Sequence, residues 1–213
     1  MKMVESDINH IVGEVIKRLQ NEKKDDEILV ETSGRHVHLS QEHVEILFGK
    51  GYELTKIKEL SQPRQYLCGE KVAVIGSKGT ILNVSVLGPI REESQVELSI
   101  TDAVSIGVKA PIRMSGDLDN SASAIIATSK DAVRLEKGVI VAKRHLHITP
   151  SDAIRYGVVN NEEVGIKTDG ERGVIFNNVI VRVSEKFKTA VHLDYDEANT
   201  CGYSKGMRAS IVK

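Results

Sequence analysis

Between positions 3 and 20, apolar residues recur at three- and four-residue spacing, and most of the charged residues fall between them. This spacing is typical of one face of an amphipathic helix. Residues 23–27 (Lys-Lys-Asp-Asp-Glu) then have the composition of a linker. A short helix gains little stability from its own propensity, so we expect it to dock on the body of the protein or on a second subunit. The apolar positions are Ile8, Ile11, Val12, Val15, Ile16 and Leu19.

From residue 28 onward the pattern changes to short Val- and Ile-rich runs with Gly and Pro turns between them. Such runs are typical of small barrels rather than of a doubly wound sheet. No run is followed by a Gly-x-Gly-x-x-Gly or Walker segment, so nucleotide binding of those kinds is unsupported. The strands we expect cover Ile28–Thr32, 72–75, 80–87, 95–100, 139–148, 164–167, 174–183 and Ala190–Leu193.

One six-residue motif occurs twice, as Arg-His-Val-His-Leu-Ser at 35–40 and Arg-His-Leu-His-Ile-Thr at 144–149, and holds four of the seven histidines. In a strand, residues two apart point to the same face, so each pair of imidazoles would face one side and the aliphatic residues the core. Paired imidazoles suit a metal ion, although a single pair could equally be solvated on an edge strand. The repetition, with Arg before and Ser or Thr after, favours the metal. The aliphatic residues are Val37, Leu39, Leu146 and Ile148.

The residues after each motif also correspond. Ser40 and Thr149 are helix N-caps by type, Pro150 suits a first helical position, and Gly49 and Gly157 follow about two turns later. The repeated unit is therefore a strand followed by a short capped helix. This predicts two related halves that meet around a shared site.

Composition excludes several classes of protein. With 29 Lys and Arg against 30 Asp and Glu, the net charge is −1 and no basic stripe favours a nucleic-acid partner. Cys68 and Cys201 are isolated, which supports neither a disulfide framework nor a Cys-x-x-Cys zinc site. No apolar run reaches membrane-spanning length, and residues 1–20 lack the apolar block of a signal peptide. We therefore expect a soluble cytoplasmic protein with no membrane partner.

Two further stretches carry chemistry. On the expected strand at 95–100, Gln95, Glu97 and Ser99 share a face, and Arg91 follows a Gly-Pro turn. A strand-face carboxylate is usually solvated. A guanidinium after a turn could bind an anion or be an ordinary surface arginine.

The second stretch, residues 190–199, places His192 beside Asp-Tyr-Asp-Glu at 194–197. These carboxylates could form a calcium-like oxygen cluster, orient the imidazoles or end a polar strand. We favour the second, because five motif histidines point to a zinc-type ion.

Five motifs, taken in order, resemble those of the PduL-type phosphate propanoyltransferases, the phosphotransacylases associated with bacterial microcompartments. The resemblance spans about residues 28–205, and the motifs lie at 35–40, 88–97, 113–117, 144–153 and 192–199. It implies a mainly β fold with short capping helices, in which two small β-barrel domains face each other across the active site. It also implies that the first strand joins the C-terminal half, so that residues 28–34 and 143–213 form one barrel and residues 35–142 the other. Residues 1–22 and 23–27 are then the N-terminal helix and its linker.

The resemblance further implies the reaction acyl-CoA + phosphate ⇌ acyl phosphate + CoA, with a propanoyl or acetyl chain. By motif, Arg91 matches the family's phosphate-contacting, catalytic arginine. His36, His38 and Glu97 match the ligands of one zinc, and His145, His147 and His192 match those of a second. Three protein ligands leave coordination positions open, as in catalytic rather than structural zinc sites. From this we expect phosphate to attack the thioester directly.

Family members inside microcompartments carry an N-terminal amphipathic extension. The resemblance therefore implies shell proteins as partners of residues 1–22, a location inside a bacterial microcompartment, and a homo-oligomer. Two other interpretations remain open at this point. One is a dinuclear zinc hydrolase that uses metal-bound hydroxide, and the other is a non-catalytic zinc-stabilised scaffold, although structural zinc sites are usually rich in thiolates.

Overall fold

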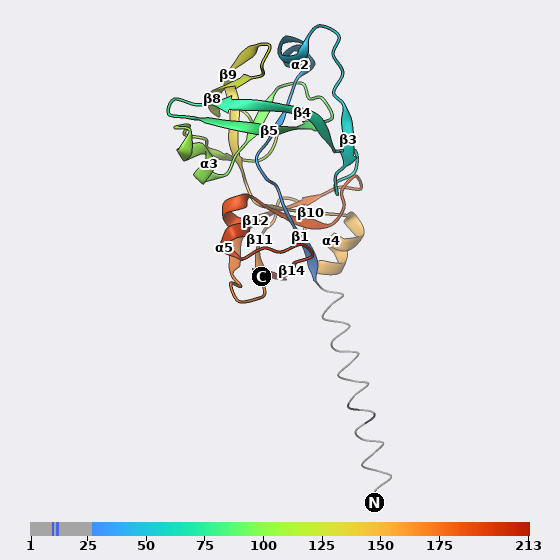
Figure 1. Cartoon of the computed structure of the whole chain (residues 1–213). Coiled ribbons are helices and arrows are strands. Elements are labelled where there is room, and N and C mark those ends of the chain that lie inside the picture. Colours follow the sequence, from blue (N-terminus) through green and yellow to red (C-terminus); the bar gives the residue numbers. More distant parts are fainter. Residues whose placement is uncertain (1–9, 11, 13–26) are drawn as a thin grey trace, which may run out of the picture.

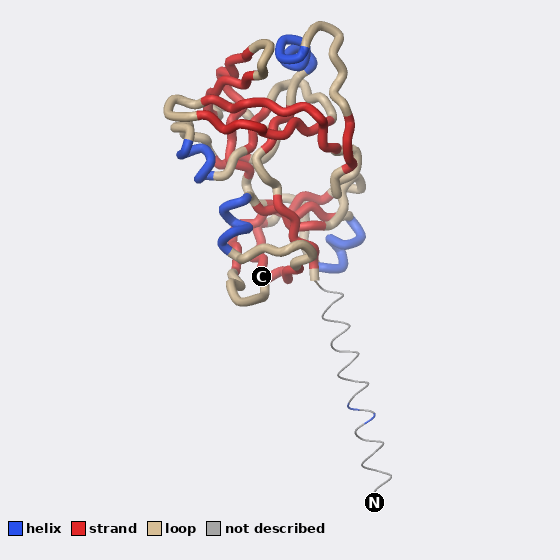
Figure 2. The backbone as a smooth tube through the Cα atoms, viewed as in Figure 1, coloured by secondary structure: helices blue, strands red, loops and turns tan. Residues whose placement is uncertain are grey.

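The protein is described from a computed structural model, which covers residues 10, 12 and 27–213. Two small barrels lie end to end along one axis (Figure 1), and the four short helices of residues 27–213 sit at their periphery (Figure 2). The expected fold class, mainly β with short helices and two barrels, is confirmed. The amphipathic helix expected over residues 3–20 lies outside the described residues, apart from His10 and Val12.

The first barrel is formed by consecutive parts of the chain. Its ring runs β4–β5–β2–β6–β9–β8 and closes from β8 back to β4, while β3 and β7 extend it at β4 and β9. Two helices, α2 (Gln41–Phe48) and α3 (Ile100–Ser105), accompany it. The strands are β2 (His36–His38), β3 (Lys56–Glu59), β4 (Tyr66–Ile75), β5 (Thr80–Gly88), β6 (Gln95–Glu97), β7 (Ile112–Arg113), β8 (Ala122–Ala127) and β9 (Ala132–Ala142).

The second barrel combines the first strand of the described body with the C-terminal part of the chain. Its closed order is β1–β13–β10–β12–β11–β14, and β14 pairs with β1. Helices α4 (Pro150–Tyr156) and α5 (Tyr195–Thr200) belong to it. The strands are β1 (Ile28–Thr32), β10 (His145–Ile148), β11 (Glu163–Thr168), β12 (Ile175–Val183), β13 (Ala190–Leu193) and β14 (Arg208–Val212).

The strand expected over residues 139–148 is in fact two strands. β9 ends at Ala142 in the first barrel, and β10 begins at His145 in the second. Lys143 and Arg144 cross between the barrels, where Lys143 N donates to Arg113 O at 2.8 Å and Arg144 Nε lies 2.9 Å from Glu197 Oε1. The prediction of one continuous strand was wrong because no glycine or proline stands between residues 139–142 and 145–148, so the sequence has no turn signal at the crossing.

Each barrel has its own apolar core. Val37 and Leu39 lie in the first core, Leu146 and Ile148 lie in the second, and all four are fully buried. This confirms that the aliphatic residues of both motifs face inward. The histidines between them therefore point to the opposite side of each short strand, towards the other barrel.

The short helices after the motifs begin as expected. Ser40 Oγ accepts a hydrogen bond from His43 N at 3.3 Å, and Thr149 Oγ1 accepts one from Asp152 N at 3.2 Å. Pro150 stands at the start of α4, and Gly157 ends it with a φ of 63°, a left-handed conformation in which glycine is unstrained. These caps fix where each motif strand turns away from the cleft between the barrels.

The two barrels repeat one arrangement, including its irregular features. The motif strands β2 and β10 each pair in parallel with one strand and antiparallel with another. Asn83 and Asn178 hold positive φ values of 58° and 57° at matching places in β5 and β12. Just before each motif strand, Arg35 pairs with Asp102 and Arg144 pairs with Glu197. The prediction of two related halves is confirmed.

Side chains also link the barrels directly. Gln62 Nε2 donates to Lys188 O at 3.0 Å, and Lys188 N donates to Gln62 Oε1 at 3.2 Å. Thr101 N donates to Asp196 Oδ2 at 2.8 Å. These contacts hold the barrels in one relative orientation. In the part of the chain that the structure describes, no helix has the length and apolarity needed to cross a membrane.

Candidate metal and phosphate site

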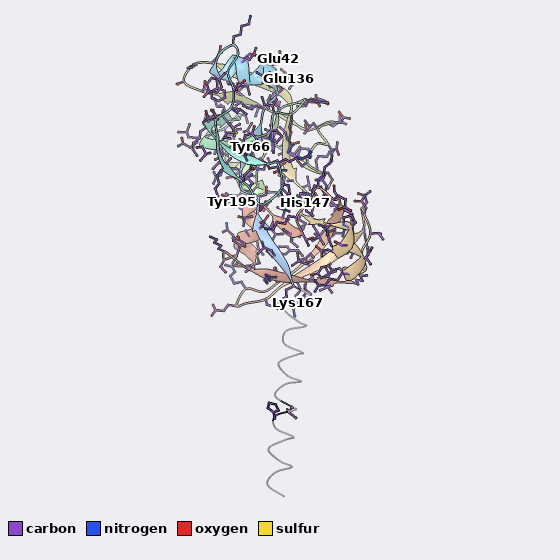
Figure 3. The ribbon with its side chains drawn as sticks, turned by 90° about the vertical axis from the view of Figure 1, so that its right-hand side faces the viewer. Glu42, Tyr66, Glu136, His147, Lys167 and Tyr195 are labelled. Atoms are coloured by element: carbon purple, nitrogen blue, oxygen red, sulfur yellow. The ribbon has the colours of Figure 1, made fainter. Side chains whose placement is uncertain are left out.

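A cleft of about 710 Å³ lies between the two barrels. Figure 3 shows His147 and Tyr195 near the level at which the barrels meet. All seven site residues expected from the sequence line this one cleft, and both barrels contribute. They are His36, His38, Arg91 and Glu97 from the first barrel and His145, His147 and His192 from the second.

The first cluster comprises His36, His38 and Glu97, whose potential ligand atoms all lie within 4.8 Å of one another. Glu97 is directly opposite His36 across the β2–β6 ladder, and its Oε2 is 3.6 Å from His36 Nε2. All three residues are at most 7% exposed. The strand pairing therefore holds three ligand-type groups together away from bulk water.

Backbone carbonyls orient the imidazoles of this cluster. His36 Nδ1 lies 2.7 Å from Gly34 O, and His38 Nδ1 lies 3.1 Å from Leu87 O. A carbonyl can only accept, so Nδ1 carries a proton in both rings, and in the neutral form Nε2 is the nitrogen with the lone pair. Such a bond on one ring nitrogen is the usual support for a metal on the other.

The second cluster comprises His145, His147 and His192, again with ligand atoms within 4.8 Å. His145 Nδ1 lies 2.9 Å from Lys143 O. His36 Nδ1 makes the same kind of bond to Gly34 O, so in both clusters the first histidine bonds the carbonyl two positions before it. His147 is 6% exposed, and neither of its ring nitrogens has a hydrogen-bond partner among the described residues. A buried imidazole without a partner is costly unless something else binds it. Together with the ring orientations, it shows that these donor sets fit metal ions.

Four of the imidazoles are held in the neutral form that a metal requires. Burial lowers the pKa of His38, His145 and His192, and it lowers the pKa of His147 to about 3. Neighbouring positive charges, Arg91 for His38 and Arg182 for the second cluster, act in the same direction. At neutral pH these rings therefore carry lone pairs rather than protons.

Glu97 is the anionic member of the clusters. Burial alone would raise the pKa of its carboxyl, but His36, a hydrogen bond with Ser115 and the charge of Arg91 hold it below its usual value. Gln95 Nε2 also donates to Glu97 Oε1. The carboxylate is thus ionised at neutral pH and oriented by neighbours on both sides.

Arg91 is fixed beside the first cluster. Its backbone N donates to Leu39 O at 3.0 Å, just after the cis Gly88–Pro89 peptide bond. Its Nη2 donates to His38 Nε2 at 2.8 Å, and its Nη1 donates to Ser115 Oγ at 3.3 Å. The guanidinium is therefore a partly buried cation next to the first cluster, which suits it to bind an anion there.

The expectation that the carboxylates at 194–197 orient the imidazoles is wrong. Asp194 caps α5 by accepting from Glu197 N, Asp196 accepts from Thr101 N, and Glu197 pairs with Arg144. The helix end and the opposite barrel therefore use these oxygens. The carboxylate near His192 is instead Glu31, whose Oε2 is 3.8 Å from His192 Nε2.

Three cleft residues escaped the sequence analysis as individual groups: Gln62, Ser115 and Arg182. Gln62 Nε2 lies 3.2 Å from His192 Nε2, although the two residues are 130 positions apart. Ser115 lies within the Arg-Met-Ser-Gly-Asp motif at 113–117, which could have identified it. Arg182 lies in the strand expected over residues 174–183, and no motif next to it indicated a functional role.

Comparison with known proteins gives a consistent result. The family model described as phosphate propanoyltransferase matches residues 29–204. A phosphate propanoyltransferase of Clostridioides difficile is 55% identical over 210 residues, which covers 99% of each chain. Proteins of the same name from Leptotrichia buccalis and Thermotoga maritima are 50% and 47% identical, over 99% of this chain and 100% of each relative.

Proposed function

The chain belongs to the phosphate propanoyltransferase family of enzymes, and from this membership we propose a phosphotransacylase that works with two zinc ions. The reaction is acyl-CoA + phosphate ⇌ acyl phosphate + CoA, with a short acyl chain, propanoyl or acetyl. The observation that carries the proposal is the cleft itself, because two three-residue clusters and Arg91 all line it.

One zinc would be held by His36, His38 and Glu97 and the other by His145, His147 and His192. Three imidazole or carboxylate ligands per ion suit zinc and leave it open to substrate. When bound, the ions would supply Lewis acidity and relieve the charge repulsion between anionic reactants. The unpartnered nitrogens of His147 and the Nδ1 bonds of His36, His38 and His145 support these ligand sets.

Arg91 would position inorganic phosphate. Phosphate is largely dianionic near neutral pH, so it needs orientation rather than a strong base to act as a nucleophile. A guanidinium offers two parallel N–H groups to two phosphate oxygens. Nη1 and Nη2 of Arg91 donate to Ser115 and His38, which both line the cleft, and this supports a guanidinium that faces it.

We propose direct transfer without an acyl-enzyme. A phosphate oxygen would bond to the acyl carbon, the C–S bond would break with its electron pair going to sulfur, and the CoA thiolate would take a proton from water. The two cysteines are each 2% exposed, and burial raises the pKa of both thiols, that of Cys68 to about 11. Neither is therefore a ready thiolate nucleophile.

The test is CoA release measured with acetyl-, propanoyl- and butanoyl-CoA, each with and without phosphate. Release that depends on phosphate and yields acyl phosphate is the expected result. Equal release without phosphate, yielding free carboxylate, would instead identify a hydrolase that uses metal-bound hydroxide. The absence of any turnover by the zinc-loaded protein would favour a scaffold.

We also propose a division of the chain that serves this activity. Residues 28–34 and 143–213 form one domain and residues 35–142 the other, so the cleft is a domain interface. Residues 1–22 form a packaging helix for shell proteins of a bacterial microcompartment and promote self-association, and residues 23–27 link this helix to the catalytic body. The apolar spacing of residues 3–20, too short and too charged to span a membrane, supports docking in a groove.

A further inference from the structure

Arg182 lies beside the second histidine cluster and faces the same cleft as Arg91. It pairs with His147 across the β10–β12 ladder, and it is among the residues that line the cleft. Burial is the largest cause that lowers the pKa of His145, His147 and His192, and the positive charge of Arg182 lowers it further. Arg182 also lowers the pKa of Arg91, so the two guanidiniums are close enough to repel each other.

The guanidinium of Arg182 has no ionic partner. Among the described residues it makes no ion pair within 4.0 Å and no side-chain hydrogen bond, and its one polar contact is the Phe187 ring at 5.6 Å. The two arginines at the barrel crossings differ from it, because Arg35 and Arg144 both pair with carboxylates. Burial lowers the pKa of Arg182, and the charge of Glu97, which lies beyond 4.0 Å, offsets this only in part. A partly buried cation without a carboxylate in contact is costly, and such a cost persists mainly where a ligand compensates it.

The repeat shows that this arginine is not required by the fold. His38 Nδ1 donates to the carbonyl of Leu87, and Leu87 stands in the first barrel where Arg182 stands in the second. Conversely, the place of Arg91 is taken in the second barrel by Ser184, since Arg91 N donates to Leu39 O and Ser184 N donates to Ile148 O. Apart from Arg35, which pairs with Asp102, each barrel therefore supplies one guanidinium to the cleft, from different positions of the same repeat.

We propose that Arg182 is a second phosphate-binding residue, which acts with Arg91 from the opposite barrel to hold inorganic phosphate between them. The inference rests on the proposed phosphotransacylase function and extends it. Two unit positive charges match the dianion, whereas the thioester carbonyl is neutral and has no need of a second cation. Because the two arginines belong to different barrels, phosphate binding would also depend on how the barrels are placed relative to each other. The phosphate groups of CoA are the other anions that could meet Arg182, and the experiment separates them.

The experiment measures the zinc-loaded enzyme with Arg182→Met, which keeps most of the length of the side chain without its charge. The KM for phosphate should rise about tenfold or more, as loss of a charge-assisted contact predicts, while the KM for propanoyl-CoA stays within about twofold. Arg182→Lys keeps the charge and loses the fork, so its phosphate KM should fall between those of the wild type and Arg182→Met. Arg134→Met is the matched control, because Arg134 is 65% exposed, pairs with Glu136 and lies outside the cleft.

A second measurement does not depend on turnover. Phosphate should raise the unfolding temperature of the zinc-loaded wild type, and Arg182→Met should lose most of that rise while Arg134→Met keeps it. If Arg182→Met alters the fold, Arg182→Lys carries the same comparison. An unchanged phosphate KM and an unchanged thermal shift in a folded variant would overturn the inference, and so would a rise in the KM of propanoyl-CoA alone.

Failure of the wider proposal gives a different pattern. A wild type that is stabilised by phosphate but does not transfer acyl groups would overturn the phosphotransacylase function. Loss of that stabilisation in Arg182→Met would still support Arg182 as a phosphate ligand.

Discussion

Glu97 occupies in the first barrel the position that His192 occupies in the second. Glu97 is opposite His36 across an antiparallel ladder, and His192 is opposite His145 in the same way. The third member of each cluster therefore comes from the same strand of the repeat, but it is a carboxylate in one case and an imidazole in the other. The repeat thus fixes where the ligands stand, and the residue types decide how much charge each site carries.

His36→Ala should remove about one of two zinc ions per chain and lower turnover by about a hundredfold or more, because it opens one cluster and leaves the other intact. Metal analysis by mass spectrometry after gel filtration checks the stoichiometry. His192→Ala should behave likewise at the second cluster. A single ion in the wild type, lost in both variants, would show that the two His-x-His pairs share one metal.

Arg91→Lys keeps the positive charge and loses the planar fork, so the KM for phosphate should rise about tenfold and that for acyl-CoA should change little. Initial rates at varied concentrations of each substrate check this. Arg113→Lys serves as a control outside the cleft lining. Equal changes in both KM values would mean that Arg91 supports the whole site rather than phosphate.

Cys68→Ala and Cys201→Ala, alone and combined, should leave turnover within about twofold, because direct transfer needs no thiol. Each change removes a buried sulfur and should cost about 1 kcal/mol of stability. Urea unfolding and a CoA-release assay measure the two effects separately. Turnover lost in folded, zinc-loaded Cys201→Ala would favour an acyl-cysteine intermediate.

Glu197 should make stability depend on pH in an unusual direction. Burial, followed by the charge of Asp194, raises the pKa of its carboxyl to about 7, although Arg144 is 2.9 Å away. The folded protein then holds more protons than the unfolded chain between about pH 4.5 and pH 7. This contribution to stability is full below pH 4.5 and is lost as the pH rises through 7.

The free energy of unfolding of the wild type, relative to Glu197→Gln, should therefore decrease by roughly 1–3 kcal/mol from pH 5.5 to pH 8. Urea unfolding of both proteins at each pH measures the difference, and the exposed Glu136→Gln provides the control. An increase with pH would mean that the ion pair with Arg144 outweighs burial.

Deleting residues 1–22 should leave zinc content and phosphate-dependent transfer nearly unchanged, because all the proposed ligands lie beyond residue 35. The deletion should shift the oligomer distribution in light scattering and abolish co-purification with microcompartment shells. A shortened protein that unfolds or loses zinc would show that the helix belongs to the catalytic body.

The histidine pairs of the two clusters could be predicted from the sequence, because the alternation of side chains along a strand depends only on neighbouring residues. His-x-His with aliphatic neighbours determines which side of β2 and β10 meets the core, and the caps at Ser40 and Thr149 follow from residue type. The proposed assignment of Glu97 and His192 to separate metals needed the resemblance, since the pairing of β2 with β6 places Glu97 opposite His36, which is 61 positions earlier in the chain.

Two errors have local physical causes. Asp194 and Glu197 form a capping box, in which each side chain bonds the other's backbone N–H, so the Asp-x-x-Glu spacing was a helix signal and not a cluster around the metal. The crossing at Lys143 and Arg144 has ordinary strand neighbours and no glycine or proline. Gln62 and Arg182 had no sequence signal, because their partners in space belong to other strands or to the opposite barrel.

The ring of the second barrel has a consequence for how the protein is made. β1 emerges from the ribosome before every strand of the first barrel, yet it pairs with β13 and β14, which are synthesised after all of them. The nascent first barrel can therefore close while β1 still has an unpaired edge. Closing the second ring joins ends far apart in sequence, which is slow and leaves strand edges open to other chains meanwhile. Chaperones that shield nascent strands should therefore matter more for the ring that contains β1 than for the ring that contains β2.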